Sequence, residues 1–370
     1  MVQFFLDHGA NTNAVSYDEE TPLHLALRQN VHGTKYQDDW TRDHWRGEYV
    51  LDLIDPEDDD ADEIYADAIK WRKDVIDKLL GHSKIDVNIQ DSKGASALHY
   101  APYGKEKCHI IVKTLVEKGA EVSAWNSRKQ SPLHLACKRG DSASTRVLLR
   151  HGANILYADD DGLNSLHYAA MSGNVETMLL VLKHSDEHGL NICISRDKME
   201  RNALHHGLTG RMTASSDERA RLLLDNGIDI KDKDVHGNSP LATYLMKPRL
   251  FINNKICRLL LESGSDAMAI NGEGLALAHL ASRCIELEAT ILEILMEFGA
   301  DMEILDRQGR TVYITQHSKV PLLRGPWHFF LKKQSFAMTT KTFLGKHHRN
   351  TLLKRRRDPV TQGPLNPAGG

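Results

Sequence analysis

The sequence has few cysteines, and their arrangement argues against a fold that is held together by disulfide bonds or by a zinc ion. Its 370 residues contain five cysteines, an odd number, and no two of them have the C-x-x-C spacing. We therefore expect neither a disulfide framework nor a structural zinc site, and we expect a reducing compartment. The cysteines are predicted to pack as small hydrophobic residues; they are Cys108, Cys137, Cys193, Cys257 and Cys284.

Long apolar runs are also missing. The chain begins with apolar residues but soon meets Asp7 and His8, so it has no signal-peptide core. No segment approaches the roughly 20 apolar residues that a membrane helix needs. We therefore expect a soluble, intracellular protein of the cytoplasm or nucleus that has no membrane partner.

The sequence lacks the short motifs that are typical of catalytic sites. It contains no H-E-x-x-H, G-x-S-x-G, G-x-x-x-x-G-K-[ST] or G-x-G-x-x-G pattern. His347 and His348 are adjacent, but neither a cysteine nor an acid stands at ligand spacing from them. We expect no enzymatic activity, no cofactor and no metal site.

Acidic residues are scarce in one region, the C-terminal tail. Residues 318–370 hold eleven Lys and Arg against one acid, Asp358, so this segment carries +10 while the whole chain carries -3. We expect it to be a disordered tail on an acidic body. Its most basic run resembles a nuclear-import signal or a nucleic-acid contact, and the alternative is a solubilising tail; the run is Lys354, Arg355, Arg356 and Arg357.

What the sequence does contain is an internal repeat. Residues 21–26 read TPLHLA and residues 131–136 read SPLHLA, and degraded copies read SALHYA at 96–101 and NSLHYA at 164–169. A Leu-rich stretch ending in Gly precedes each copy, and six of eight such glycines stand 15 residues before the histidine position. The variable length therefore lies between the histidine and the following glycine. The histidines of the phrase are His24, His99, His134, His167 and His205.

Each unit is predicted to be a helix–turn–helix with a connecting turn. Ser or Thr stands at the helix N-cap and Pro at the first helical position, where its missing N–H costs nothing. A second helix follows, with Leu, Ile and Val at helical spacing, and an Asx-x-x-Gly turn, as at residues 91–94 and 306–309, begins the next unit. The glycines after the second helices fit a left-handed conformation; they are Gly119, Gly152, Gly227, Gly264 and Gly299.

This pattern resembles the ankyrin-repeat family, whose unit of ~33 residues is a finger-like β-turn and two antiparallel helices. The resemblance covers residues 1–317 and implies an all-α solenoid of about eight units, the first and last incomplete. It also implies that the repeated histidines are structural, because in this family the imidazole hydrogen-bonds the backbone of the neighbouring finger. The function that it implies is the binding of proteins.

Two features depart from a regular array. Residues 1–6 read as the second helix of a unit that lacks its first helix, which is expected if the chain is a piece of a longer array. Residues 31–63 are an acidic insertion with Trp40 and Trp45, predicted to be either a docking loop or a solvated surface loop. From Ile64 the helix resumes, and one face is expected to carry Ile64, Ala68, Trp71, Val75, Ile76, Leu79 and Leu80.

We expect a scaffold or adaptor that binds one or more proteins through the concave face formed by fingers and first helices. One alternative is a nuclear regulator whose basic tail supports import or DNA contact, and another is a detached sensor array of a larger protein. Aromatic and Arg residues anchor interfaces, although the neighbouring charged strips can instead neutralise each other. The expected contact residues are Trp125, Arg128, Lys129, Lys138, Arg139, Tyr157, Asp160, Asp161 and Met171.

Overall fold

The computed structural model describes residues 2–28, 61–103, 108–211, 213, 215–247, 252–282 and 288–312. All of them belong to one compact unit, which ends at Val312. The basic tail at 318–370 with its import cluster, most of the acidic insertion and Cys284 lie outside the described residues.

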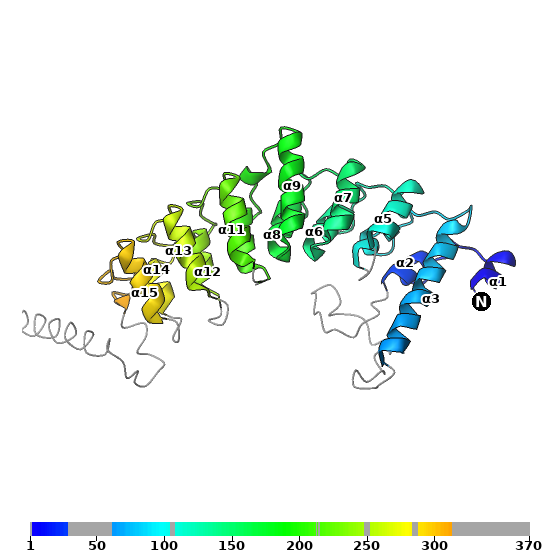
Figure 1. The fold of residues 1–370 in the computed structure, drawn as a ribbon. Helices are drawn as coiled ribbons and strands as arrows, with labels where there is room; N and C mark the ends of the chain where they lie inside the picture. The colour runs from blue at the N-terminus through cyan, green and yellow to red at the C-terminus, as the bar shows by residue number, and fades with distance from the viewer. Residues whose placement is uncertain are drawn as a thin grey trace, which may run out of the picture. The chain divides into compact units, whose positions relative to one another are not determined.

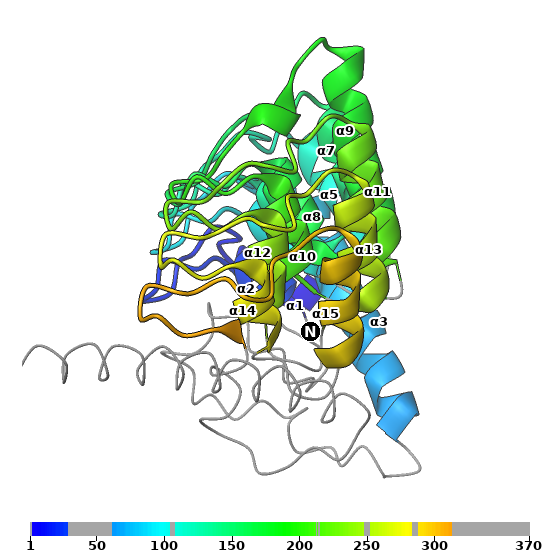
Figure 2. The same cartoon turned by 90° about the vertical axis from the view of Figure 1, so that its left-hand side faces the viewer.

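The described part of the chain consists of helices in two layers, with turns on one side (Figures 1 and 2). Seven first helices form the inner layer, beside the turns: α2 (Pro22–Arg28), α4 (Ala97–Tyr100), α6 (Pro132–Arg139), α8 (Ser165–Ser172), α10 (Ala203–Thr209), α12 (Pro240–Leu245) and α14 (Leu277–Ser282). The second helices are α1 (Val2–Asp7), α3 (Ala61–Gly81), α5 (Cys108–Glu117), α7 (Ser142–Arg150), α9 (Val175–Glu187), α11 (Ser216–Asp225), α13 (Asn254–Glu262) and α15 (Glu288–Glu297). Two 3₁₀ turns join them, η2 (Ala101–Tyr103) and η3 (Ile192–Ile194).

The first helices begin where the repeated phrase predicts. At α8 the amide oxygen of Asn164 accepts the N–H groups of Leu166 and His167 at 3.1 and 3.2 Å, and Nδ1 of His167 accepts the N–H of Asn164 at 3.1 Å. This reciprocal cap satisfies three N–H groups that have no partner inside the helix. At α6 the helix starts on Pro132, directly after the N-cap Ser131.

The second helices end on glycines in the left-handed conformation, as predicted. The φ angles of the five expected glycines lie between +81° and +101°. A Cβ at any of them would meet no atom within 4 Å. The backbone conformation alone therefore favours glycine at these helix ends.

One hydrophobic core runs between the two layers through all the described units. Its inner-layer residues include the leucine before each repeated histidine, and these leucines are fully buried. Cys108, Cys137 and Cys257 are buried and Cys193 is half-buried. Burial raises the pKa of the Cys108 thiol to about 11, which keeps it protonated near pH 7.

The structure corrects two details at the insertion. Helix α3 begins at Ala61, so residues 61–63 of the predicted loop are helical. Trp71 was expected on the buried face but is 60% exposed. The reason is that Arg72 donates from Nε and Nη2 to the carbonyls of Ala26 and Leu27, at the C-terminal end of α2. Trp71 therefore lies near the point where α3 extends beyond the C-terminal end of α2.

The remaining expectations concern the first helix and the membrane. In α1, Val2 and Leu6 pack partly against the core, while Phe4 and Phe5 are 58% and 55% exposed. Within the described residues, no helix combines the length and the apolar character that crossing a membrane requires.

Candidate protein-binding surface

Each finger is shaped by the side chain at its first position. In the finger of residues 159–163, Oδ1 of Asp159 accepts the N–H groups of Asp161 and Leu163 at 2.9 and 2.8 Å. Because the turn is closed by its own first residue, its shape is set locally. The same two hydrogen bonds occur at Asp91, Asn126, Asp197, Asp234, Asn271 and Asp306.

Main-chain hydrogen bonds join neighbouring fingers side by side. The N–H of Asp160 donates to the carbonyl of Arg128 at 3.0 Å, and the N–H of Lys198 donates to the carbonyl of Asp161 at 2.9 Å. Equivalent bonds occur in the fingers before and after these, at Ser92, Ser127, Val235 and Gly272. The fingers therefore form a continuous layer beside the first helices (Figure 2), which we call the finger ribbon.

A histidine ties the first helix to the next finger in five of the described units, whereas Nε2 of the buried His167 has no hydrogen-bond partner among the described residues. Nδ1 of His99 accepts the N–H of Ser96 at 3.0 Å, so Nε2 carries the proton and donates to the carbonyl of Gln130 at 3.0 Å. The same pair of contacts is made by His24, His134, His205 and His279, with Nε2–O distances of 2.8 to 3.1 Å.

Burial keeps the five histidines of the repeated phrase neutral. It lowers the pKa of His24, His134 and His205 below the ordinary value of 6.5. The pKa of His99 falls to about 4 and that of His167 to about 3 for the same reason. Near pH 7 the repeated histidines are therefore neutral, and those whose two ring nitrogens are both hydrogen-bonded are engaged in holding the fold.

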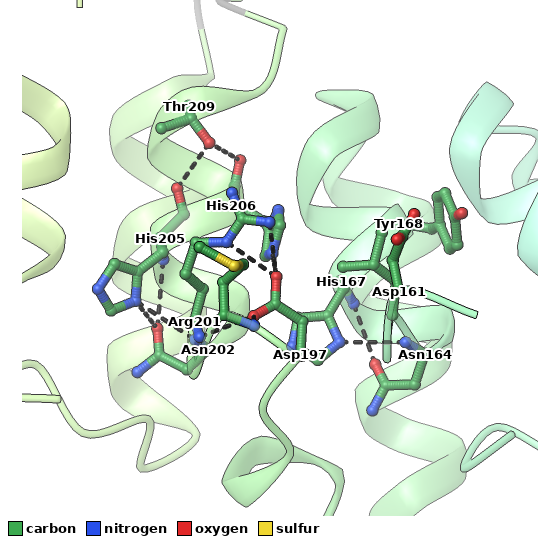
Figure 3. Close-up of polar contacts among 12 residues, drawn as sticks. Asp161, Asn164, His167, Tyr168, Asp197, Arg201, Asn202, His205, His206 and Thr209 are labelled. Carbon is green, nitrogen blue, oxygen red and sulfur yellow. Dashed lines mark hydrogen bonds and ion pairs between the residues drawn. The ribbon is translucent and has the colours of Figure 1, made fainter. Parts of the chain in front are cut away.

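A buried polar centre lies beside two of these histidines, between α8 and α10 (Figure 3). Oδ2 of Asp197 accepts from Nε2 of His206 at 2.9 Å and from Nε of Arg201 at 2.8 Å. Although burial by itself raises the pKa of Asp197, these hydrogen bonds outweigh it and hold the pKa below its usual range. The ring of His206 meets that of His167 edge-to-face, with centroids 5.3 Å apart.

The sequence interpretation missed this pairing, which recurs along the array. The hydroxyl of Tyr168 donates to Oδ2 of Asp159 at 2.6 Å, and that of Tyr100 donates to Oδ2 of Asp91 at 2.5 Å. In each case the donor directly follows the repeated histidine and stands nine residues after the acid. The signal was therefore present as a fixed spacing between an Asp and a Tyr or His.

The structure brings four of the expected contact residues together on two adjacent fingers. The rings of Trp125 and Tyr157 meet edge-to-face with centroids 5.4 Å apart, and Trp125 is 47% exposed. Nζ of Lys129 lies 3.2 Å from Oδ1 of Asp160, and both side chains are exposed to solvent. An aromatic pair and an ion pair thus stand on the same stretch of the finger ribbon.

The other expected contact residues are not part of these two pairs. Arg128 and Asp161 are exposed on the same fingers. Lys138 and Arg139 are half-buried in the last turn of α6, roughly 10 Å along the helix axis from its finger end. Met171 packs partly against the core, and its carbonyl accepts the N–H of Arg211 at 3.0 Å.

Exposed apolar side chains continue along the finger ribbon beyond the expected residues. Ile270 and Leu305 occupy the position of Trp125, directly before the first residue of their fingers, and are 45% and 58% exposed. Met199 and Val235 are exposed within their fingers. The sequence interpretation did not include these four residues among the expected contacts.

Comparison with known proteins agrees with this architecture. A family model described as ankyrin repeats (3 copies) matches residues 64–159 and 105–195. Residues 64–195 of this chain are ankyrin repeats. The ankyrin repeat domain of human ASB11 superimposes with a TM-score of 0.51 at 21% identity, covering 61% of this chain and 93% of that domain. The predicted all-α ankyrin fold is therefore confirmed.

The ankyrin-repeat relatives match this chain over only part of their own length. Human ankyrin repeat and SOCS box protein 6 is 28% identical over 209 residues, which are 54% of this chain and 46% of that protein. Ankyrin repeat protein nuc-2 of Neurospora crassa is 36% identical over 113 residues, which are 30% of this chain and 10% of that protein. The chain thus spans less than half of either relative. What the match supports is a module of the kind that generally binds other proteins.

Proposed function

We propose that this ankyrin-repeat chain is an intracellular, non-enzymatic scaffold or adaptor that binds a protein partner on the finger ribbon around residues 125–161. The observation that carries the proposal is the exposed Trp125, packed edge-to-face on the half-buried Tyr157, beside the ion pair of Lys129 and Asp160. Aromatic side chains with a solvent-exposed face are the commonest energetic anchors of protein interfaces.

The rigidity of the finger ribbon supports this role. Its turns are closed by Asx side chains, and its fingers are linked by main-chain hydrogen bonds and by the buried histidines. A partner therefore meets a surface whose backbone loses little freedom on binding, which lowers the cost of association.

The charges on the same fingers support a partner of mixed polarity. The ion pair of Lys129 and Asp160 is exposed, and such pairs contribute only ~0–1 kcal/mol to stability. Both groups are therefore available to a partner's opposite charges at little expense to the fold. Arg128 and Asp161 are exposed on the same fingers and add one further positive and one further negative charge to this surface.

The proposal is tested by comparing two tryptophans of the same chain. Trp125→Ala removes the ribbon anchor, and Trp71→Ala removes a tryptophan that is at least as exposed, at 60%, but lies on α3. The full chain and both variants are used as bait in native extract, and the affinity of each recovered partner is then measured with purified proteins. We expect Trp125→Ala to weaken binding by 2 kcal/mol or more, about 30-fold, as for an interface hot spot.

Trp71→Ala is expected to bind as the unchanged chain does, and far-UV circular dichroism establishes that both variants are folded. A partner that is lost with Trp71→Ala but kept with Trp125→Ala would refute the proposed surface. A third bait that ends before residue 318 addresses the tail: partners lost only from this bait would move the binding function to residues 318–370.

A further inference from the structure

The C-terminal end of α9 carries a cluster of side chains that the protein-binding role does not use. Helix α9 has 13 residues, whereas its neighbours α7 and α11 have 9 and 10, and Figure 1 shows α9 extending past both. The last turn of α9 contains His184 and Glu187, and His188 is its C-cap. The extra length therefore presents these three residues beyond the neighbouring helices.

The geometry of the three side chains suits a common ion. Residues four apart lie on the same face of a helix, and the rings of His184 and His188 have centroids 4.1 Å apart. One ligand atom from each ring and one oxygen of Glu187 lie within 4.8 Å of one another. Donors bound to one tetrahedral zinc ion at ~2.0–2.1 Å are roughly 3.3 Å apart. Small rotations of these largely exposed side chains close that difference.

A hydrogen bond already orients one ring as a ligand. Nδ1 of His188 lies 2.8 Å from the carbonyl of His184, so Nδ1 carries the proton and donates. The lone pair is then on Nε2, which is the tautomer that a metal requires. Metal-binding histidines commonly have their other nitrogen fixed by a carbonyl or carboxylate in this way.

The local electrostatics favour a cation. The carbonyls at a helix C-terminus form the negative end of the helix dipole, and Glu187 adds a carboxylate. The competing ion pair of Glu187 with Lys183 is long, at 3.7 Å, and exposed, so it holds the carboxylate weakly.

We propose that His184, Glu187 and His188 form a binding site for a late first-row divalent metal ion, with zinc as the representative ion. Two imidazole nitrogens and one carboxylate oxygen are a donor set that such ions accept. Three protein donors leave the fourth position of a tetrahedral ion for water or for a side chain of a bound protein. The sequence search missed this site because the residues follow the order H-x-x-E-H, the reverse of the order that was sought.

The test is a titration of the full chain with Zn²⁺ by calorimetry, compared with His184→Ala, His188→Ala and Glu187→Gln. The control is His151→Ala, because His151 is the exposed C-cap of α7, the equivalent position on the neighbouring helix. We expect the His184 and His188 variants to lose about 10-fold or more in zinc affinity and Glu187→Gln to bind more weakly than the unchanged chain. The His151 variant should match the unchanged chain. Other histidines of the chain contribute the same background to every variant.

Substitution with Co²⁺ gives an independent reading of the geometry. A site with two imidazoles and a carboxylate should produce the visible absorption of low-coordinate Co²⁺, and this absorption should disappear in the His184 and His188 variants. Zinc isotherms of His184→Ala and His188→Ala that coincide with that of the unchanged chain would overturn the site. Unchanged affinity in Glu187→Gln would overturn the three-ligand assignment. Far-UV circular dichroism establishes that each variant keeps its helices.

Discussion

Replacement of Gly162 by alanine tests how closely adjacent fingers approach each other. Gly162 is the fourth residue of its finger and has a φ of +83°. A Cβ placed there would lie 2.8 Å from the backbone nitrogen of Lys198 and 3.1 Å from two backbone atoms of Asp197. Cβ atoms do not approach backbone atoms this closely, so the two fingers must move apart. That movement stretches the hydrogen bond from the N–H of Lys198 to the carbonyl of Asp161, which is 2.9 Å long.

Gly152 provides a matched control because its φ is also +83° but no atom lies within 4 Å of its Cβ position. Alanine in the left-handed conformation costs ~1–2 kcal/mol at either position. The smaller gain from restricting the unfolded chain is also common to both. Overpacking adds ~1–3 kcal/mol at Gly162 alone. We therefore expect Gly162→Ala to be ~1–3 kcal/mol less stable than Gly152→Ala.

The free energy of unfolding of both variants is measured by urea titration, followed by far-UV circular dichroism. Equal m-values are needed for the comparison, because a repeat array can unfold in parts. A difference below ~0.5 kcal/mol, the usual range for a neutral substitution, would refute the reasoning. It would mean that adjacent fingers separate without cost and that the finger ribbon is not a rigid surface.

Two further predictions concern the buried polar groups. The folded-state pKa of His99 is about 4, below its ordinary value of 6.5, so its contribution to stability is complete above pH 6.5 and is lost as the pH falls toward 4. In His99→Ala, urea titrations over this range should show a pH dependence smaller by up to ~1.4 kcal/mol per pH unit, and an unchanged slope would contradict the assignment. Tyr168→Phe removes a hydroxyl that accepts from Gln130 and donates to Asp159, both at 2.6 Å, and should cost ~1–3 kcal/mol in unfolding free energy. Tyr100→Phe, which loses one such contact, should cost less, and equal losses would show that the link to Gln130 contributes nothing.

The features that the sequence predicted well are those that depend on neighbouring residues. Helix starts follow from the capping residue and proline, and helix ends follow from glycines that need a positive φ. Both requirements repeat in most units, so the interval between them defines the fold even where single copies are degraded. The all-α ankyrin array could therefore be predicted from residues 1–312 without knowledge of any contact.

The features that the sequence did not predict depend on contacts between elements. The spacing of α3 places Trp71 with Val75 and Ile76, but only the position of Arg72 at the end of α2 shows where burial stops. The spacing of apolar residues indicates which face of a helix is buried, but it does not indicate where the partner helix ends. Similarly, the half-buried Met171 packs on its own array because residues 210 and 211 of the next unit lie against its backbone.

The same architecture explains how a rigid surface can carry variable side chains. The hydrogen bonds that fix a finger use its backbone, its first side chain and the histidine of the preceding unit, and none uses the side chain just before the finger. That position is exposed in every described finger from the second onward, where it is Gln90, Trp125, Ala158, Arg196, Lys233, Ile270 and Leu305. Gln90 donates to the carbonyl of Trp125, and Arg196 forms ion pairs with Glu200 of its own finger and with Asp232. Otherwise these residues differ in size and charge without a matching change in the turn they precede. Substitution of Trp125 should therefore change binding without changing the fold, because stability and recognition reside in different atoms of the same finger.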